Sequence, residues 1–156
     1  MFKTGMKNIL LMRLALGWLF FYSGITKVIN PEWSSIGYLK GAATFTGLYT
    51  WFASANIVPI VDFMNQWGLT LLGISLIFGI AVKLSSLLGA VLMLLYYFPI
   101  LVFPHVGDHS YLVDEHIIYL LILFSFITLR AGRYYGVDAF LARRFGKNRF
   151  ITKYLV

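Results

Sequence analysis

Residues 63–82, FMNQWGLTLLGISLIFGIAV, and residues 84–103, LSSLLGAVLMLLYYFPILVF, decide the fold of this chain. Each stretch holds twenty residues without a charged side chain, and only Lys83 separates the two. An α-helix needs roughly twenty predominantly apolar residues to cross the hydrocarbon core of a bilayer. The sequence therefore predicts two membrane-spanning helices, over about 62–82 and 84–103, joined by a very short connection.

Two shorter apolar runs flank this pair. Each has thirteen uncharged residues: Leu14–Thr26 between Arg13 and Lys27, and Ile117–Leu129 before Arg130. A run of this length makes roughly 20 Å of helix, whereas the hydrocarbon core is about 30 Å thick. We therefore expect two further spans, over about 9–29 and 112–130, whose flanking charges either reach the headgroups or lie at membrane depth against protein.

The composition supports a membrane protein with one domain over residues 1–156. The chain is 60% hydrophobic and only 12% charged, whereas about a quarter of the residues of a soluble domain are charged. It has no cysteine, which excludes disulfides, thiolate metal sites and thiol nucleophiles. The formal net charge of +7 reports topology in such a protein, so no nucleic-acid partner is expected.

The segment between the first two spans differs from the rest. It is rich in aromatic residues mixed with Ser, Thr and Gly: Trp33, Tyr38, Tyr49, Trp51 and Phe52. Such a composition suits an interfacial or re-entrant segment better than another span. We therefore expect an all-α membrane protein, a four-transmembrane-helix bundle with an extra segment over 31–60. The tail 134–156 begins with an amphipathic pattern that is typical of a helix lying on anionic lipid.

The distribution of charge predicts the orientation. Eleven of the 13 Lys and Arg residues precede the first span, lie between the second and third, or follow the fourth. Five of the six acidic residues and all three histidines fall on the opposite side. By the positive-inside rule, we expect a multi-pass protein of the cytoplasmic membrane with both termini in the cytoplasm.

A polar cluster is expected at the outer end of the bundle. Its members are Lys27, at the end of the first span, Asp62, at the start of the second, and Asp114, Glu115 and His116, at the start of the fourth. Intramembrane ionisable residues usually pair and mark functional sites, so we expect Lys27 to contact at least one of Asp114, Glu115 or His116. The alternative is that Lys27 reaches the headgroups while the acids favour a helix N-terminus.

The histidines raise the question of a metal or haem. All three lie within twelve positions on one side of the membrane, so no pair can hold a haem from two spans of this chain. A metal site at His105, His109 and Asp108 is the less favoured alternative, because Pro104 and Gly107 disfavour a helix through the two histidines. No haem or metal is therefore expected.

Several motifs resemble those of the DoxX/DoxD family of four-helix membrane proteins. They are RLALGWLFFYSGITKV (13–28), WGLTLLGISLIFGIAVKLSSLLGAVLMLLYY (67–97), LVDEHIIYLLIL (112–123) and GRYYGVDAFL (132–141). The last two are closest to the DoxD-like branch, which is named for the membrane subunit of a thiosulfate:quinone oxidoreductase. The resemblance implies a four-helix fold and, through that branch, a quinone-linked activity with a separate partner subunit or a homo-oligomer.

Two functions remain open from the sequence. In the first, the chain is a subunit of a quinone-linked oxidoreductase, in which Lys27 polarises a quinone carbonyl and Asp114, Glu115 or His116 relays protons. The expected binding residues are Tyr22, Ser23, Asp62, Tyr97 and Tyr119, and Phe20 and Tyr96 are further candidates for the lining. In the alternative, the chain is a non-catalytic membrane adaptor or chaperone that stabilises a partner protein, and the same charges form a buried structural network in which Lys27 pairs with Asp114 or Glu115.

Overall fold

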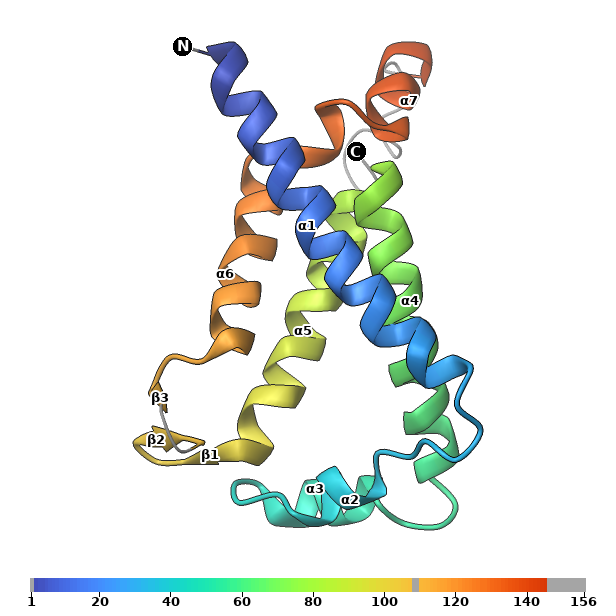
Figure 1. Ribbon diagram of the computed structural model, residues 1–156, viewed down its shortest axis with the longest axis vertical. Helices are drawn as coiled ribbons and strands as arrows, with labels where there is room; N and C mark the ends of the chain where they lie inside the picture. The colour runs from blue at the N-terminus through green and yellow to red at the C-terminus, as the bar shows by residue number, and fades with distance from the viewer. Residues whose placement is uncertain (1, 108–109, 146–156) are drawn as a thin grey trace.

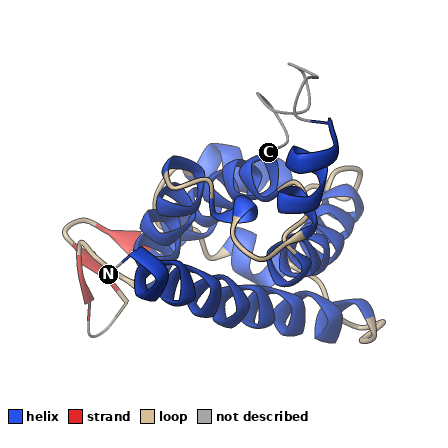
Figure 2. Ribbon diagram, turned by 90° about the horizontal axis from the view of Figure 1, so that it is seen from above, coloured by secondary structure: helices blue, strands red, loops and turns tan. Residues whose placement is uncertain are grey.

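The computed structural model describes residues 2–107 and 110–145, and these residues are mostly helical (Figure 1). The helices are α1 (Phe2–Val28), α2 (Ile36–Lys40), α3 (Thr46–Phe52), α4 (Val58–Phe78), α5 (Val82–Ile100), α6 (Glu115–Thr128) and α7 (Val137–Phe145), with a 3-10 turn η1 at Ala131–Arg133. Helices α1, α4, α5 and α6 form a bundle, with α2 and α3 at one end and α7 at the other (Figures 1 and 2). We call the first the α2/α3 end of the bundle and the second the α7 end.

Three helices have the length and composition of membrane spans. They are α1 from Gly5 onward, α4 and α5. Helix α6 is apolar but has only 14 residues, about 21 Å at 1.5 Å per residue. Of the four predicted spans, three are therefore matched by helices of sufficient length among the described residues, and the crossing of α6 stays a prediction.

The break between α4 and α5 lies at Gly79–Ala81, so the predicted boundary at Lys83 was wrong. Gly79 has a φ of 69°, and Ala81 has a φ of 48°. The Gly79 N–H bonds to the Ser75 carbonyl, which ends α4 with the left-handed residue that glycine adopts at least cost. Lys83 lies in the first turn of α5. The prediction failed because a charge-free run does not reveal where a helix ends, whereas a glycine cap ends one.

The structure also contains a small antiparallel sheet, which the predicted all-α fold did not include. It consists of β1 (Leu101–Val102), β2 (His105–Val106) and β3 (Ser110–Tyr111), in the order β1-β2-β3, with Val102 paired to His105. Helix α5 ends soon after Pro99, and Pro104 favours an extended conformation at the residue before it. The last residues of the predicted span 84–103 therefore form a strand.

The expected segment over 31–60 forms two short helices. Leu39 on α2 and Tyr49 on α3 are buried in a small hydrophobic cluster with Ala53. The Tyr49 hydroxyl donates to the Leu95 carbonyl at 3.0 Å, so the segment is attached to α5. Whether it enters the membrane stays a prediction.

Helices α1 and α4 approach each other very closely through glycine. A Cβ atom on Gly73 would lie 2.3 Å from the Phe21 nitrogen, and one on Gly24 would lie 2.4 Å from the Thr70 nitrogen. Both neighbours are backbone atoms, which a side-chain rotation cannot move aside. Small residues are thus required at this helix–helix contact, as is usual where spans pack without help from water.

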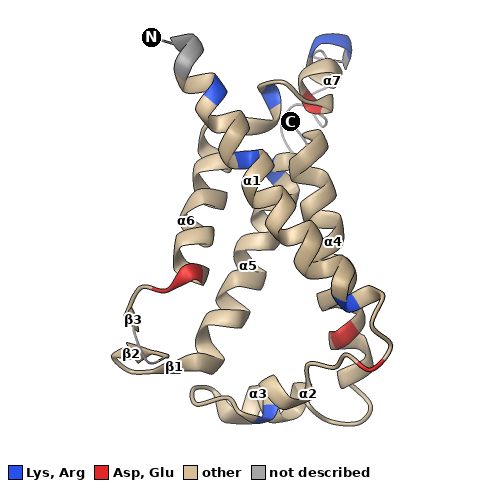
Figure 3. Ribbon diagram, viewed as in Figure 1, with Lys and Arg blue, Asp and Glu red and all other residues tan. Residues whose placement is uncertain are grey.

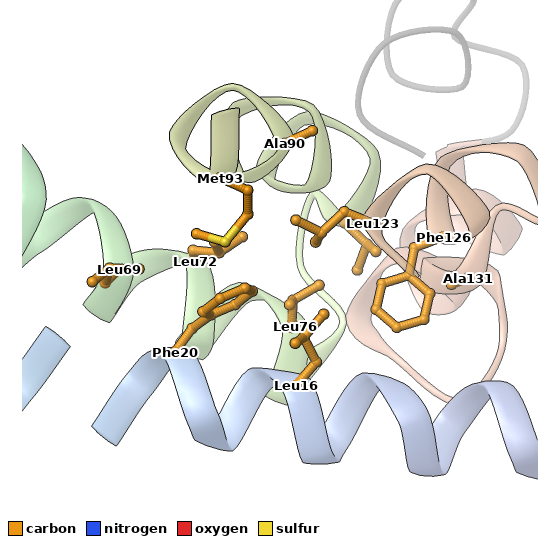
Figure 4. Close-up of a cluster of buried hydrophobic side chains, with 11 residues drawn as sticks. Leu16, Phe20, Leu69, Leu72, Leu76, Ala90, Met93, Leu123, Phe126 and Ala131 are labelled. Carbon is orange, nitrogen blue, oxygen red and sulfur yellow. The ribbon is translucent and has the colours of Figure 1, made fainter. Parts of the chain in front are cut away.

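The core joins all four bundle helices (Figure 4). Its buried members are Leu16 and Phe20 of α1, Leu69, Leu72 and Leu76 of α4, Val82, Ala90 and Met93 of α5, Leu123 and Phe126 of α6, and Ala131 of η1. Large apolar side chains on the other faces, such as Trp18, Phe63 and Leu121, remain exposed, as expected for surfaces that face lipid.

Arg13 is buried at the α7 end, with only 1% of its surface exposed. Its Nη1 donates to the carbonyls of Ala131 and Tyr134, at 2.9 and 3.0 Å, and its Nη2 donates to the Tyr135 carbonyl at 2.7 Å. The sequence left open whether the flanking charges reach the headgroups or lie against protein. Arg13 lies against protein. It attaches α1 to the chain that follows α6.

Asp138 is the other buried charge at this end, with 1% exposed. Its carboxylate accepts hydrogen bonds from the Ala81 and Val82 N–H groups, at 2.7 and 2.9 Å. Burial raises the pKa of Asp138, while these two hydrogen bonds and the charge of Arg13 act in the opposite direction. Asp138 thus caps α5 and fixes the start of α7 to it.

The glycine contact generates the first prediction. Gly73→Ala should lower stability by about 1–3 kcal/mol, the usual cost of overpacking, because α1 must move away from α4. Gly68→Ala is the matched control on the same helix, since its Cβ would meet nothing within 4 Å. Thermal unfolding in mild detergent measures both. A Gly73→Ala variant as stable as Gly68→Ala contradicts the close contact.

Candidate functional site

Three polar side chains from three helices meet at the α2/α3 end. Lys27 lies in the last turn of α1, and its Nζ donates to the Asn65 Oδ1 of α4 at 2.9 Å and to the Tyr96 hydroxyl of α5 at 3.4 Å. Asn65 is 7% exposed, so the cluster lies inside the bundle. We name Lys27, Asn65 and Tyr96 the Lys27 triad.

The positive charge of Lys27 is held by neutral groups. Its Nζ lies 4.8 Å from the ring centroid of Trp33 and 5.5 Å from that of Tyr96, distances at which an ammonium is attracted by an aromatic face. The C-terminal end of α1 carries the negative end of the helix dipole, which favours a cation. The site therefore keeps a net positive charge that a partially negative ligand oxygen can use.

The predicted contact of Lys27 with Asp114, Glu115 or His116 was wrong. Its hydrogen bonds go to Asn65 and Tyr96, and no ion pair with an acid is found for it within residues 2–107 and 110–145. Asp114 instead accepts from the Ile117 N–H at 3.2 Å as the N-cap of α6. Helix capping and the neighbouring histidine thus occupy the carboxylate that the prediction assigned to the lysine.

His116 nevertheless lies next to the triad. Its Nδ1 bonds to the Asp114 Oδ2 at 2.5 Å, and its ring centroid lies 5.7 Å from that of Tyr96. Asp114 is buried, and His116 keeps 18% of its side-chain surface exposed. A hydrogen-bonded carboxylate–imidazole pair therefore stands beside the phenol ring that contacts Lys27.

Glu115 lies apart from this pair. Its side chain is exposed and accepts from the Tyr119 hydroxyl at 3.2 Å, one helical turn further on. The Tyr119 ring packs edge-on against Phe20, with centroids 5.8 Å apart. Successive residues of a helix differ by about 100° in direction, so Glu115 and His116 point to different surroundings.

A large apolar groove separates α4 from α5. It has a volume of about 670 Å³. Asn65 and Tyr96 of the triad lie on its lining, together with Leu72, Leu88, Ser75 and Ser85 further along. From Tyr96 to Ser85 it follows about 16 Å of α5, at 1.5 Å per residue. The groove thus leads from the triad toward the opposite end of the bundle.

Two tyrosines close the groove at the α2/α3 end. Tyr38 and Tyr49 both line it. The Tyr38 hydroxyl donates to the Tyr96 carbonyl. Burial raises the pKa of Tyr38, and Tyr49 and Asp114 add to the effect, while burial alone raises the pKa of Tyr49. Both phenols therefore stay protonated and keep their hydrogen bonds to α5.

The remaining expected binding residues are not brought to the triad. Asp62 accepts from the Ser35 N–H at 2.8 Å and from its hydroxyl, which fixes the start of α2. The Tyr97 hydroxyl donates to the Leu112 carbonyl at 2.7 Å. Tyr22 is exposed and stacks on Trp18. Ser23 is half-buried, and its carbonyl accepts from Thr26.

The less favoured alternative was a metal site of three residues, and the structure describes only one of the three. Asp108 and His109 lie outside the described residues, and His105 is exposed with its ring against Tyr111. Within residues 2–107 and 110–145, no group of three or more His, Asp or Glu side chains is arranged to hold a metal ion.

A comparison with known families identifies the family of the chain. The sequence model described as DoxX matches residues 8–102, which is more than half of the chain. The chain belongs to the DoxX family. DoxX is a membrane family, and together with three span-length helices this makes the chain a multi-pass membrane protein. No curated protein and no solved structure matches it. The matched range includes the whole Lys27 triad and ends before α6.

The sequence signal for the triad was incomplete. Asn65 lies within a run that was selected because it lacks charge, so an uncharged amide drew no attention there. A buried amide in a membrane-spanning helix is itself a signal, because polar side chains at such positions bond to neighbouring helices. Trp33 carried no such signal, since it was one of many aromatic residues in its segment.

The second prediction concerns the hydrogen bond between Lys27 and Asn65. Asn65→Leu should lower stability by about 1–3 kcal/mol, because the ammonium loses its nearest oxygen partner inside the bundle. Lys27→Met together with Asn65→Leu should restore most of that loss, since both polar partners are then gone. Thermal unfolding in detergent tests this, with Gln66→Leu as the control on the same helix. A double variant no better than Asn65→Leu argues against the pairing.

Proposed function

We propose that this DoxX protein is the membrane subunit of a quinone-linked oxidoreductase and that the groove between α4 and α5 holds the quinone. The observation that carries the proposal is an apolar groove of about 670 Å³ with Asn65 and Tyr96 on its lining and Lys27 bonded to both. A quinone has an apolar tail and two carbonyl oxygens, so it needs this combination of a greasy slot and a few placed polar groups. When bound, it accepts two electrons and two protons.

Tyr96 is the proposed hydrogen-bond donor to the quinone. Its oxygen accepts from Lys27, so its own hydrogen remains for an oxygen in the groove. Donation from an ammonium polarises the phenol and strengthens the bond that the phenol makes in turn. Lys27 thus acts on the quinone through Tyr96 rather than by direct contact, and its charge stabilises negative charge that develops on the reduced ring.

Asp114 and His116 are the proposed route for protons. The imidazole of His116 can accept and donate a proton through its two ring nitrogens, and the hydrogen bond to Asp114 orients the ring. His116 is partly exposed on one side and contacts the Tyr96 ring on the other. Glu115, which is exposed and bonded to Tyr119, is proposed to collect protons from the aqueous side.

Electrons must come from another protein in this proposal. The chain has no cysteine, so a persulfide or thiol route through it is closed. The resemblance of residues 112–123 and 132–141 to the DoxD-like branch supports a partner subunit that oxidises thiosulfate. A non-catalytic adaptor is the alternative that the quinone measurement below separates from this proposal.

The third prediction is the orientation, which we propose from the positive-inside rule. Lys and Arg concentrate at the α7 end (Figure 3), so this end should face the cytoplasm. Asn8→Cys and Asn56→Cys are matched single-cysteine variants, because the chain has no cysteine and both asparagines are exposed and uncharged. A membrane-impermeant maleimide on intact cells should label Asn56→Cys only. Labelling of Asn8→Cys contradicts the orientation.

The fourth prediction is the presence of quinone in the purified protein. Extraction in mild detergent followed by assay of the lipid fraction should find close to one quinone per chain. Tyr96→Phe should lower this content by about tenfold, because a hydroxyl bonded to a charged group contributes roughly 1.5–3 kcal/mol. Tyr22→Phe is the control, since Tyr22 is exposed and does not line the groove. No quinone in the unaltered protein argues for the adaptor, and equal quinone content in both variants contradicts Tyr96 as the hydrogen-bond donor.

A further inference from the structure

A second pocket lies at the α7 end, and its lining shares no residue with the proposed quinone groove. It has a volume of about 450 Å³ and is bounded by the start of α1, the segment from Arg133 to Gly136, and α7. Its lining includes Met6, Arg133, Tyr134, Tyr135, Ala142 and Arg143. None of these residues takes part in the Lys27 triad or the groove, so the pocket requires its own explanation.

Buried contacts fix the wall of this pocket. Arg13 holds the carbonyls of Tyr134 and Tyr135, at 3.0 and 2.7 Å. Gly136 packs against the α4–α5 turn so closely that a Cβ on it would lie 2.9 Å from the Gly79 Cα. Tyr135 has a φ of 53°, a left-handed conformation that a tyrosine adopts only where its surroundings impose it. The segment is therefore held in one conformation before any ligand arrives.

The pocket carries positive charge. Arg133 and Arg143 both line it, and no acidic side chain of the described residues does. The nearest acid in the chain, Asp138, is buried and bonds to the backbone of α5. Arg143 uses one of its five donor hydrogens for the Ala139 carbonyl, which leaves the end of its guanidinium for a ligand. Guanidinium groups match the oxygens of a phosphate.

The same pocket has an apolar side. Met6, Ala139 and Ala142 contribute to its lining, and Met6 lies where the apolar segment of α1 begins, next to Gly5. Large apolar side chains nearby, Tyr135 and Phe140, are 60% and 62% exposed. A free anion needs no such surface, whereas a lipid at the level where the bundle leaves the membrane has acyl chains that cover it.

We propose that this pocket binds the phosphate headgroup of an anionic glycerophospholipid. Arg143 binds the phosphate, Arg133 lines the same pocket, and the acyl chains lie along Met6 and the exposed apolar side chains of α7. The proposal goes beyond the general attraction of an amphipathic basic helix to an anionic surface, because it assigns one lipid to one pre-formed pocket. It does not depend on the quinone proposal.

The test uses the full chain, purified in mild detergent and depleted of lipid. Short-chain phosphatidylglycerol should raise the midpoint of thermal unfolding with a saturable dose dependence. Phosphatidylcholine of the same chain length and inorganic phosphate should not. Arg143→Gln should weaken the apparent affinity for phosphatidylglycerol by about fivefold, the effect of one basic side chain at an anionic headgroup. Arg144→Gln, an exposed neighbour outside the lining, should change it by less than about twofold.

A second variant tests the proposal even if Arg143→Gln fails to fold. Ala142→Leu narrows the pocket without changing any charge, so it too should weaken the response to phosphatidylglycerol. Equal effects of Arg143→Gln and Arg144→Gln, with no effect of Ala142→Leu, show diffuse attraction to charge and overturn the proposal. Stabilisation by inorganic phosphate at matched concentration identifies a phosphate site and overturns the assignment to lipid.

Discussion

Helix α1 carries a cation near each end of its apolar run, and the other helices and loops supply hydrogen-bond acceptors to both. Arg13 is bonded to three carbonyls of the chain after α6, and Lys27 is bonded to an amide of α4 and a phenol of α5. A charged side chain at membrane depth is costly unless protein groups surround it. Arg13 therefore holds the chain after α6 against α1, whereas Lys27 links α1 to α4 and to α5 at the other end.

The groove follows from the same arrangement. At the α7 end, the Gly79–Ala81 turn and the cap from Asp138 keep α4 and α5 close together. Toward the α2/α3 end the two helices diverge (Figure 1), and the tyrosines of α2 and α3 close the space by bonding to carbonyls of α5. The space between the helices is mostly apolar, with the triad at one end and the hydroxyls of Ser75 and Ser85 further along. The groove thus lies between the closely held α7 end of these two helices and the triad that the half-buried Lys27 forms at the other end.

The sequence predicted this design in part. Charge-free runs identify span-length helices, and they did so for α4 and α5, but they misplaced the break between the two because Gly79 ends a helix without any charge. The rule that buried charges pair with charges suggested an acidic partner for Lys27, whereas an amide, a phenol and two aromatic faces serve instead. Asp138 was the one acid on the basic side, and its isolation there was a signal of burial. The sequence could not predict that Arg13 bonds to backbone carbonyls, because every residue has a carbonyl.

The most direct test of the account is photo-cross-linking with an azido-quinone, followed by mass spectrometry of the labelled peptides. The account predicts labelling on the groove side of α4 and α5, at residues such as Met64 and Leu92, which line it. It also predicts that labelling falls in Tyr96→Phe and when unlabelled quinone is added. Labelling concentrated on the lipid-facing side of α1, around Trp18 and Tyr22, or unaffected by competition, would contradict a quinone site in the groove.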